Sequence, residues 1–187
     1  MAKSPGFWNL PNILTVIRIA CVPVMVVLLW DEPSIVESQL AFWLFIGAMI
    51  TDIIDGYLAR KWGLVSPIGA YLDPMADKLM VTTVLVMMVP LGWVPAWLCA
   101  LLLGREIAIT GLRGIASQEG ITISASSLGK AKTAYQSTAL GFILWRIPTL
   151  DIDTWSAGIV LLYIATAISV VSAVQYFAAF VRASTRI

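Results

Sequence analysis

Six long apolar stretches follow one another along the chain, separated by short segments rich in proline, glycine and charge. A helix that spans a membrane needs about 20 predominantly apolar residues, which is close to the length of these stretches. Proline, glycine and clustered charges interrupt helices, so the separating segments predict where each helix ends. The pattern predicts six helices, at residues 13–30, 39–61, 67–90, 93–117, 128–145 and 154–181.

A further apolar segment, PGFWNLPNIL at residues 5–14, leads into the first predicted helix. It is too short to cross a membrane, and aromatic side chains such as Phe7 and Trp8 favour the headgroup region. We therefore expect a short interfacial segment before the first helix.

The composition identifies the environment of these helices. Hydrophobic residues make up 59% of the chain and charged residues 12%, with a mean hydropathy of +0.88, whereas a soluble domain is about 45–50% apolar and about 25% charged. The sequence therefore predicts an all-α, polytopic membrane protein with six transmembrane helices. Six helices with short connections account for the 187 residues, so we expect a single membrane domain over residues 1–187.

Lysine and arginine are distributed unevenly between the two sides of the predicted bundle. The connections after the first, third and fifth helices contain Arg146 as their one basic residue, and the opposite side carries all the others. Basic residues favour the cytoplasmic side of a membrane. The distribution predicts that both termini, and the connection between the second and third helices, lie at the cytoplasmic face.

Four aspartates lie close to that connection. Asp52 and Asp55 are three residues apart in the second predicted helix, and Asp73 and Asp77 are four residues apart in the third. Either spacing places the pair on one helical face. Helices joined by a short turn are antiparallel neighbours, so we expect two acidic faces opposite each other at the cytoplasmic end.

Clustered carboxylates at a membrane repel one another and need compensating charge. The chain has no histidine, and a site with only oxygen ligands suits Mg²⁺ or Mn²⁺. Two divalent ions balance four carboxylates, and a two-metal site stabilises phosphoryl displacement. Gly56 and Gly69 allow a substrate to approach closely, which together with Arg60 favours an enzyme acting on a phosphorylated substrate. Acidic residues within membranes also relay ions or protons, so an ion- or proton-coupled transporter is the alternative.

The complete spacing resembles the signature of the CDP-alcohol phosphatidyltransferases, with all eight fixed positions matched: Asp52-x2-Asp55-Gly56-x2-Ala59-Arg60-x8-Gly69-x3-Asp73-x3-Asp77. Fixed residues at this many set spacings are a far more specific signal than a single short motif. The resemblance implies a six-helix membrane enzyme that moves a phosphatidyl group from CDP-diacylglycerol to an alcohol and releases CMP.

The resemblance also implies roles for individual residues. It assigns Asp52, Asp55 and Asp73 to one metal ion, and Asp52, Asp73 and Asp77 to a second. Asp77 would also be the general base for the acceptor hydroxyl. The residues implied on the CDP-diacylglycerol side are Gly56, Ala59, Arg60, Gly69 and, as a weaker candidate, Ser66.

Four further segments, NLPNILTVIR, LDPMADK, REI and GKAKT, resemble the bacterial branch of the family whose acceptor is glycerol 3-phosphate, the phosphatidylglycerophosphate synthases. A phosphate on the acceptor needs cations, and the expected ones are Arg105, Arg113, Lys130 and Lys132. Basic residues at helix ends also serve simply as anchors, which is the alternative for each of the four. Cardiolipin synthases of the same family, which use phosphatidylglycerol as acceptor, share the first two segments and are the alternative function within the family.

Arg18 lies about one turn inside the first predicted helix, where an unpaired charge is unfavourable. We expect it to point into the site and to join the acceptor-phosphate ligands, with Asn12 and Thr15 beside it on the CDP-diacylglycerol side.

The implied localisation is the bacterial cytoplasmic membrane. The expected partners are the two substrates and the bilayer, with no nucleic acid, and the resemblance leaves a homodimer open.

Overall fold

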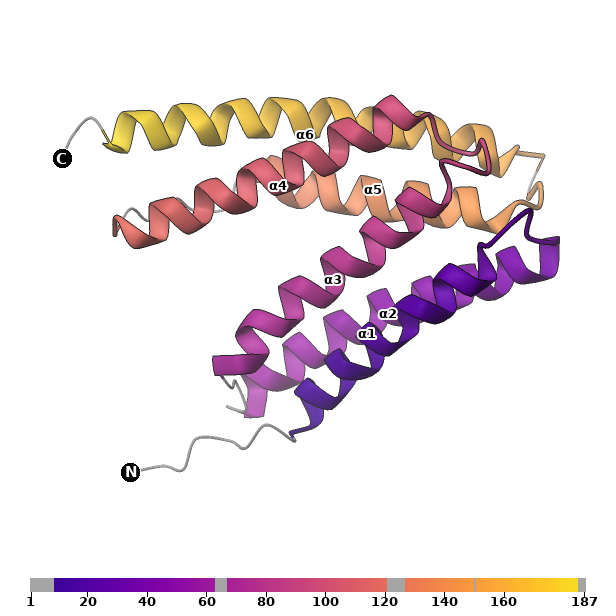
Figure 1. Ribbon diagram of the computed structural model, residues 1–187, viewed down its shortest axis with the longest axis horizontal. Helices are drawn as coiled ribbons and strands as arrows, with labels where there is room; N and C mark the ends of the chain where they lie inside the picture. Colours follow the sequence, from indigo (N-terminus) through magenta and orange to yellow (C-terminus); the bar gives the residue numbers. More distant parts are fainter. Residues whose placement is uncertain (1–8, 63–66, 121–126, 150, 185–187) are drawn as a thin grey trace. The chain divides into compact units, whose positions relative to one another are not determined.

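The computed structural model describes residues 9–62, 67–120, 127–149 and 151–184, except for the side chains of residues 11, 57–60, 62, 67–68, 70–71 and 127. These ranges are helical and contain no strand, apart from an isolated bridge between Thr149 and Ile152. The predicted all-α class and the predicted number of helices are confirmed. The six helices (Figure 1) are α1 (Leu10–Leu28), α2 (Ile35–Trp62), α3 (Pro67–Met87), α4 (Ala96–Gln118), α5 (Ser127–Trp145) and α6 (Thr154–Ser184).

The start of α1 corrects the expected interfacial segment. The Asn9 side chain caps the helix by accepting a hydrogen bond from the backbone N–H of Asn12 at 2.9 Å, and Pro11 occupies the first turn. Both are favoured positions for these residues at a helix start. Residues 10–14 therefore belong to α1, and the expectation of a separate interfacial segment is wrong for them. Phe7 and Trp8 lie outside the described residues.

The described helices form two compact units, each with its own contacts. The first contains α1, α2 and α3, together with residues 144–147 at the end of α5. The second contains α4, most of α5, and α6. The aspartates of the signature belong to the first unit, and Arg105, Arg113, Lys130 and Lys132 belong to the second.

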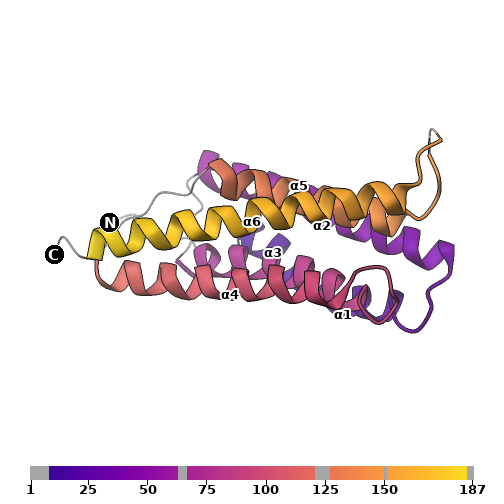
Figure 2. The same cartoon turned by 90° about the horizontal axis from the view of Figure 1, so that it is seen from above.

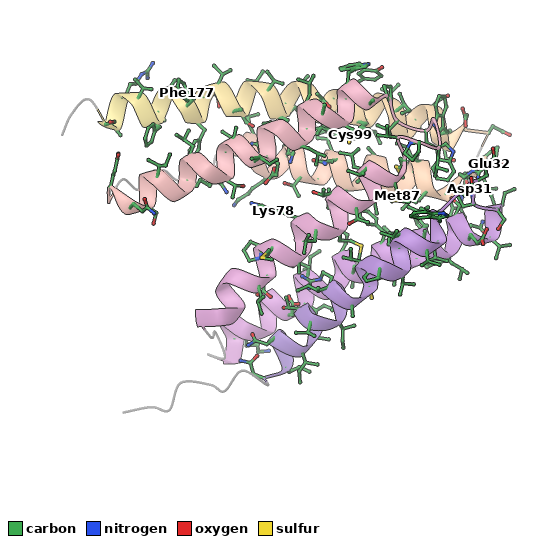
Figure 3. The ribbon with its side chains drawn as sticks, in the orientation of Figure 1. Asp31, Glu32, Lys78, Met87, Cys99 and Phe177 are labelled. Carbon is green, nitrogen blue, oxygen red and sulfur yellow. The ribbon has the colours of Figure 1, made fainter. Side chains whose placement is uncertain are left out.

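In the first unit, α1 packs along both α2 and α3, which also contact each other. Fully buried Met25, Phe45 and Met80 supply apolar core from each of the three helices. The turn between α1 and α2 contains Asp31 and Glu32, both with positive φ (Figure 3). Arg146 also contacts this turn, since its Nη1 donates to the backbone carbonyl of Pro33 at 2.8 Å.

In the second unit, α4 and α6 lie side by side (Figures 1 and 2). The indole N–H of Trp155, at the start of α6, donates to the carbonyl of Trp93 just before α4, at 3.2 Å. Near the other end, the guanidinium of Arg113 lies 5.5 Å from the ring centre of Tyr176. The two helices therefore run parallel to each other. The chain returns through α5, which lies between α4 and α6 in the sequence.

Apolar length singles out two of the described helices as candidates for crossing a membrane. They are Ile35–Gly56 within α2 and Thr154–Ser184, and Asn12–Leu28 forms a shorter apolar helix. The six membrane spans expected from the sequence stay a prediction.

Candidate active site

Three of the four signature aspartates are held by side chains from α1. The Arg18 guanidinium donates from Nη1 to Asp52 Oδ1 at 2.6 Å and from Nη2 to Asp55 Oδ2 at 2.5 Å. One turn earlier on α1, Thr15 Oγ1 donates to Asp73 Oδ1 on α3. Since residues three apart share a helical face, one face of α1 links carboxylates from two different helices.

Burial differs strongly among these charged groups. The side chains of Arg18 and Asp55 are each 1% exposed, whereas that of Asp52 is 36% exposed. A buried ion pair survives when good geometry offsets the desolvation of both charges. The two short contacts of Arg18 meet that requirement, and they leave Asp52 more open to solvent than Asp55.

Two buried polar atoms at this site lack hydrogen-bond partners among the described residues: Asp55 Oδ1 and Arg18 Nε. Leaving a buried acceptor unsatisfied typically costs about 1–3 kcal/mol, and more when it is charged. Such an atom indicates that a ligand completes the site. For a carboxylate oxygen, the natural ligand is a cation.

The donor chemistry of the site fits a hard divalent cation. Asp52, Asp55 and Asp73 offer only oxygen, which suits Mg²⁺ or Mn²⁺, and the buried Asp55 Oδ1 has no hydrogen-bond partner in the part of the chain that the structure describes. As they stand, no three acidic or thiol side chains among those described lie close enough together to hold one ion. The positive charge next to Asp52 and Asp55 comes from Arg18 instead.

The remaining signature positions lie on the same two helices. Asp77 follows Asp73 by one turn of α3 and is half-buried, next to Lys78 (Figure 3). Gly56 follows Asp55 on α2, and Gly69 is buried near the start of α3. Ser66 and the side chains of Ala59 and Arg60 lie outside the described residues.

The expected neighbours of Arg18 are also found on α1. Asn12 and Thr15 are both buried on the same helix as Arg18, about two turns and one turn, respectively, toward its start. Arg18 points to the aspartates, as its place in the sequence predicts. Its expected role as a ligand of the acceptor phosphate stays a prediction, as does the contact of Asn12 and Thr15 with the CDP-lipid.

A basic cluster in the second unit is organised by Glu106. Glu106 Oε2 accepts hydrogen bonds from Lys132 Nζ of α5 at 2.9 Å and from Arg105 Nη1 of α4 at 3.0 Å. Arg105 Nη2 also donates to Ser172 Oγ of α6 at 3.0 Å. Lys132 is 7% exposed. The three side chains combine two positive charges with one negative charge, so the cluster carries a net positive charge.

The other two predicted basic ligands lie apart from Glu106. Arg113 stacks on Tyr176, and Lys130 is exposed at the start of α5. Arg105 and Arg113 both reach α6, at Ser172 and Tyr176, so both lie on the side of α4 that faces α6. The structure therefore separates a pair linked by Glu106, half-buried Arg105 and buried Lys132, from the exposed Arg113 and Lys130.

Comparison with known proteins identifies the class that this helical fold and aspartate site define. The family model for CDP-alcohol phosphatidyltransferase matches residues 8–174, and the chain belongs to this family.

Several similar proteins carry one name, CDP-diacylglycerol–glycerol-3-phosphate 3-phosphatidyltransferase. That of Bacillus subtilis (strain 168) is 36% identical over 181 residues, covering 91% of this chain and 94% of its own length. That of Rickettsia bellii is 37% identical over 176 residues, covering 91% and 94%. That of Salmonella choleraesuis is 34% identical over 176 residues, covering 92% and 94%.

Proposed function

We propose that this protein transfers a phosphatidyl group from CDP-diacylglycerol to glycerol 3-phosphate, giving phosphatidylglycerophosphate and CMP. The observation that carries the proposal is the complete aspartate signature on α2 and α3, three of whose carboxylates accept hydrogen bonds from side chains of α1. The names of the relatives support glycerol 3-phosphate as the acceptor, because their similarity extends over about nine tenths of this chain.

The reaction forms one bond at phosphorus and breaks another. The acceptor oxygen attacks the phosphorus attached to diacylglycerol, and the phosphorus–oxygen bond to CMP breaks. Two ions of Mg²⁺ or Mn²⁺, held by Asp52, Asp55, Asp73 and Asp77, would neutralise the diphosphate and improve CMP as a leaving group. Asp77 takes the proton of the attacking hydroxyl, a role that suits a carboxylate in a chain without histidine. Gly56, Ala59, Arg60, Ser66 and Gly69 are assigned to the CDP-lipid.

Arg105 and Lys132 are the leading ligands for the phosphate of the acceptor. Glu106 holds both cations by one oxygen, which restricts their side chains before a substrate arrives. Hydrogen bonds between ionised groups are about twice as strong as neutral ones, so preoriented cations favour a phosphate. Arg113, Lys130 and Arg18 are the further candidates that the sequence supplies.

The proposed location is the bacterial cytoplasmic membrane, with six spanning helices and both termini in the cytoplasm. The exposed side of α6 supports a membrane environment, since it carries Val160, Ile164, Val171, Val174 and Phe177, the last of which is labelled in Figure 3. Contiguous apolar surface of this kind marks contact with lipid or with another protein. The uneven distribution of lysine and arginine supports the orientation.

The test supplies purified protein with CDP-diacylglycerol and Mg²⁺ or Mn²⁺, and offers several acceptors in parallel. Release of CMP with glycerol 3-phosphate is expected. Release with phosphatidylglycerol and not with glycerol 3-phosphate would reassign the protein as a cardiolipin synthase. If no acceptor gives CMP, ion or proton flux in liposomes that stops on Asp-to-Asn substitution would establish a transporter instead.

A further inference from the structure

Helix α1 carries none of the signature residues, yet its side chains contact three of the four signature aspartates. Thr15 and Arg18 are three residues apart and so lie on one face of α1. From that face, Thr15 reaches Asp73 on α3, and Arg18 reaches Asp52 and Asp55 on α2. The relative placement of the two acidic helices therefore depends on this face.

The contacts engage one oxygen of each carboxylate. Arg18 binds Oδ1 of Asp52 and Oδ2 of Asp55, and Thr15 binds Oδ1 of Asp73. The second oxygen of Asp55 is buried and has no partner among the described residues. A carboxylate fixed through one oxygen presents the other in a defined direction, which is what a metal ligand requires.

The same geometry argues against Arg18 as a ligand of the acceptor phosphate. Both of its terminal nitrogens are already paired with carboxylates, and its side chain is 1% exposed. Its Nε, which has no partner among the described residues, is itself buried. A phosphate would therefore have to reach a guanidinium that is buried and already paired with two carboxylates.

We propose that Thr15 and Arg18 are positioning residues that orient Asp52, Asp55 and Asp73 for a divalent cation, an inference that rests on the proposed function. They act on the cation through the carboxylates and do not contact the acceptor. Loss of a side chain that orients a metal ligand typically lowers metal affinity about 10–100-fold. The leading candidates for the acceptor phosphate, Arg105 and Lys132, belong to the second unit.

The experiment measures Mn²⁺ binding to the purified full-length chain by electron paramagnetic resonance, without either lipid or acceptor. Thr15→Val keeps the shape of the side chain and removes its hydroxyl, whereas Thr15→Ser keeps the hydroxyl. Thr15→Val is expected to weaken Mn²⁺ binding about 10–100-fold, with Thr15→Ser close to wild type. Thr82→Val, on α3 beyond Asp77, is the matched control and should bind Mn²⁺ as wild type does.

Arg18 is tested in the same way. Arg18→Met removes both ion pairs, and Arg18→Lys restores the charge with a single donor group. We expect weak Mn²⁺ binding for the first and intermediate binding for the second. Because a buried Asp55 without Arg18 can prevent folding, circular dichroism and size-exclusion chromatography accompany each variant, and the Thr15 pair decides the question if Arg18→Met does not fold.

Unchanged or tighter Mn²⁺ binding in Thr15→Val would overturn the inference. So would an Arg18→Lys variant that binds Mn²⁺ normally but has a raised KM for glycerol 3-phosphate, because that result makes Arg18 a phosphate ligand. In either case CMP release by the wild-type protein would leave the proposed function intact. A wild-type protein that neither binds Mn²⁺ nor releases CMP would overturn both.

Discussion

At the scale of single residues, the proposed mechanism depends most on Asp77. It lies one turn beyond Asp73 on α3 and is half-buried. Asp77→Asn keeps the size of the side chain and removes its ability to accept a proton. We expect turnover to be nearly abolished while most of the CDP-diacylglycerol binding remains, because general-base assistance contributes roughly 10²–10⁴-fold to the rate. Steady-state CMP release and binding of the CDP-lipid measure the two effects, and normal turnover would exclude Asp77 as the base.

The basic pair that Glu106 links, Arg105 and Lys132, makes a second prediction at this scale. Lys132→Ala should raise the KM for glycerol 3-phosphate roughly tenfold or more, because a hydrogen bond to a charged group contributes about 1.5–3 kcal/mol. Glu106→Gln should raise the same KM, since it releases both Lys132 and Arg105. The KM for CDP-diacylglycerol is the internal control. Lys130→Ala, at an exposed position, should raise the KM for glycerol 3-phosphate less than Lys132→Ala does. An equal rise would show that burial does not distinguish the residues that bind the acceptor phosphate.

The aspartates could be found from the sequence because their spacing is local. A separation of three or four residues places carboxylates on one helical face, whatever the rest of the chain does. The contact between Thr15 and Asp73 spans 58 residues, and no local pattern predicts which of the polar residues on α1 will meet which carboxylate. The contacts of Ser172 and Tyr176 were not predicted for the same reason, since each lies in an apolar helix and meets an arginine of α4 that is distant in the sequence.

At the scale of elements, the close contact between α5 and α6 is the most specific packing feature. A Cβ added at Gly158 would lie 2.6 Å from Ile143 Cγ1, and 2.9 Å from the backbone oxygen of Ala139. Gly158→Ala should therefore destabilise the protein by about 1–2 kcal/mol, because overpacking outweighs the better helix propensity of alanine. The midpoint of thermal unfolding in detergent measures the effect.

Gly111 on α4 provides the matched control for that substitution. A Cβ built there meets none of the described atoms within 4 Å. Gly111→Ala should leave the unfolding midpoint unchanged or raise it slightly. A fall of the same size in both variants would show that the loss at Gly158 does not come from its contact with α5.

The helices were predicted well because apolar length and helix-breaking residues are strong signals. Their ends were less predictable, because an end depends on a specific cap. Asn9 moves the start of α1 to Leu10, so the short interfacial segment expected over residues 5–14 becomes in part the first turn of a longer helix. Arg146 is the one basic residue on the side of the predicted bundle that otherwise lacks them. Its position has a structural reason, because it donates to the carbonyl of Pro33.

At the scale of the whole molecule, the proposed orientation in the membrane can be tested at the two ends of α2. Glu32 lies in the turn between α1 and α2, and Lys61 lies at the far end of α2. In a variant without Cys21 and Cys99, Glu32→Cys should react with a membrane-impermeant maleimide in intact cells. Lys61→Cys should react only after the cells are permeabilised. The reverse pattern would contradict cytoplasmic termini, and reaction of both in intact cells would contradict a spanning α2.

The identity of the acceptor is the central question, and the chemical identity of the lipid product answers it. Purified protein is incubated with CDP-diacylglycerol, Mn²⁺ and either glycerol 3-phosphate or phosphatidylglycerol, and the lipids are identified by mass spectrometry. We expect phosphatidylglycerophosphate from glycerol 3-phosphate, with one CMP released for each molecule formed, and no product from phosphatidylglycerol. Cardiolipin formed from phosphatidylglycerol, with no phosphatidylglycerophosphate from glycerol 3-phosphate, would contradict it.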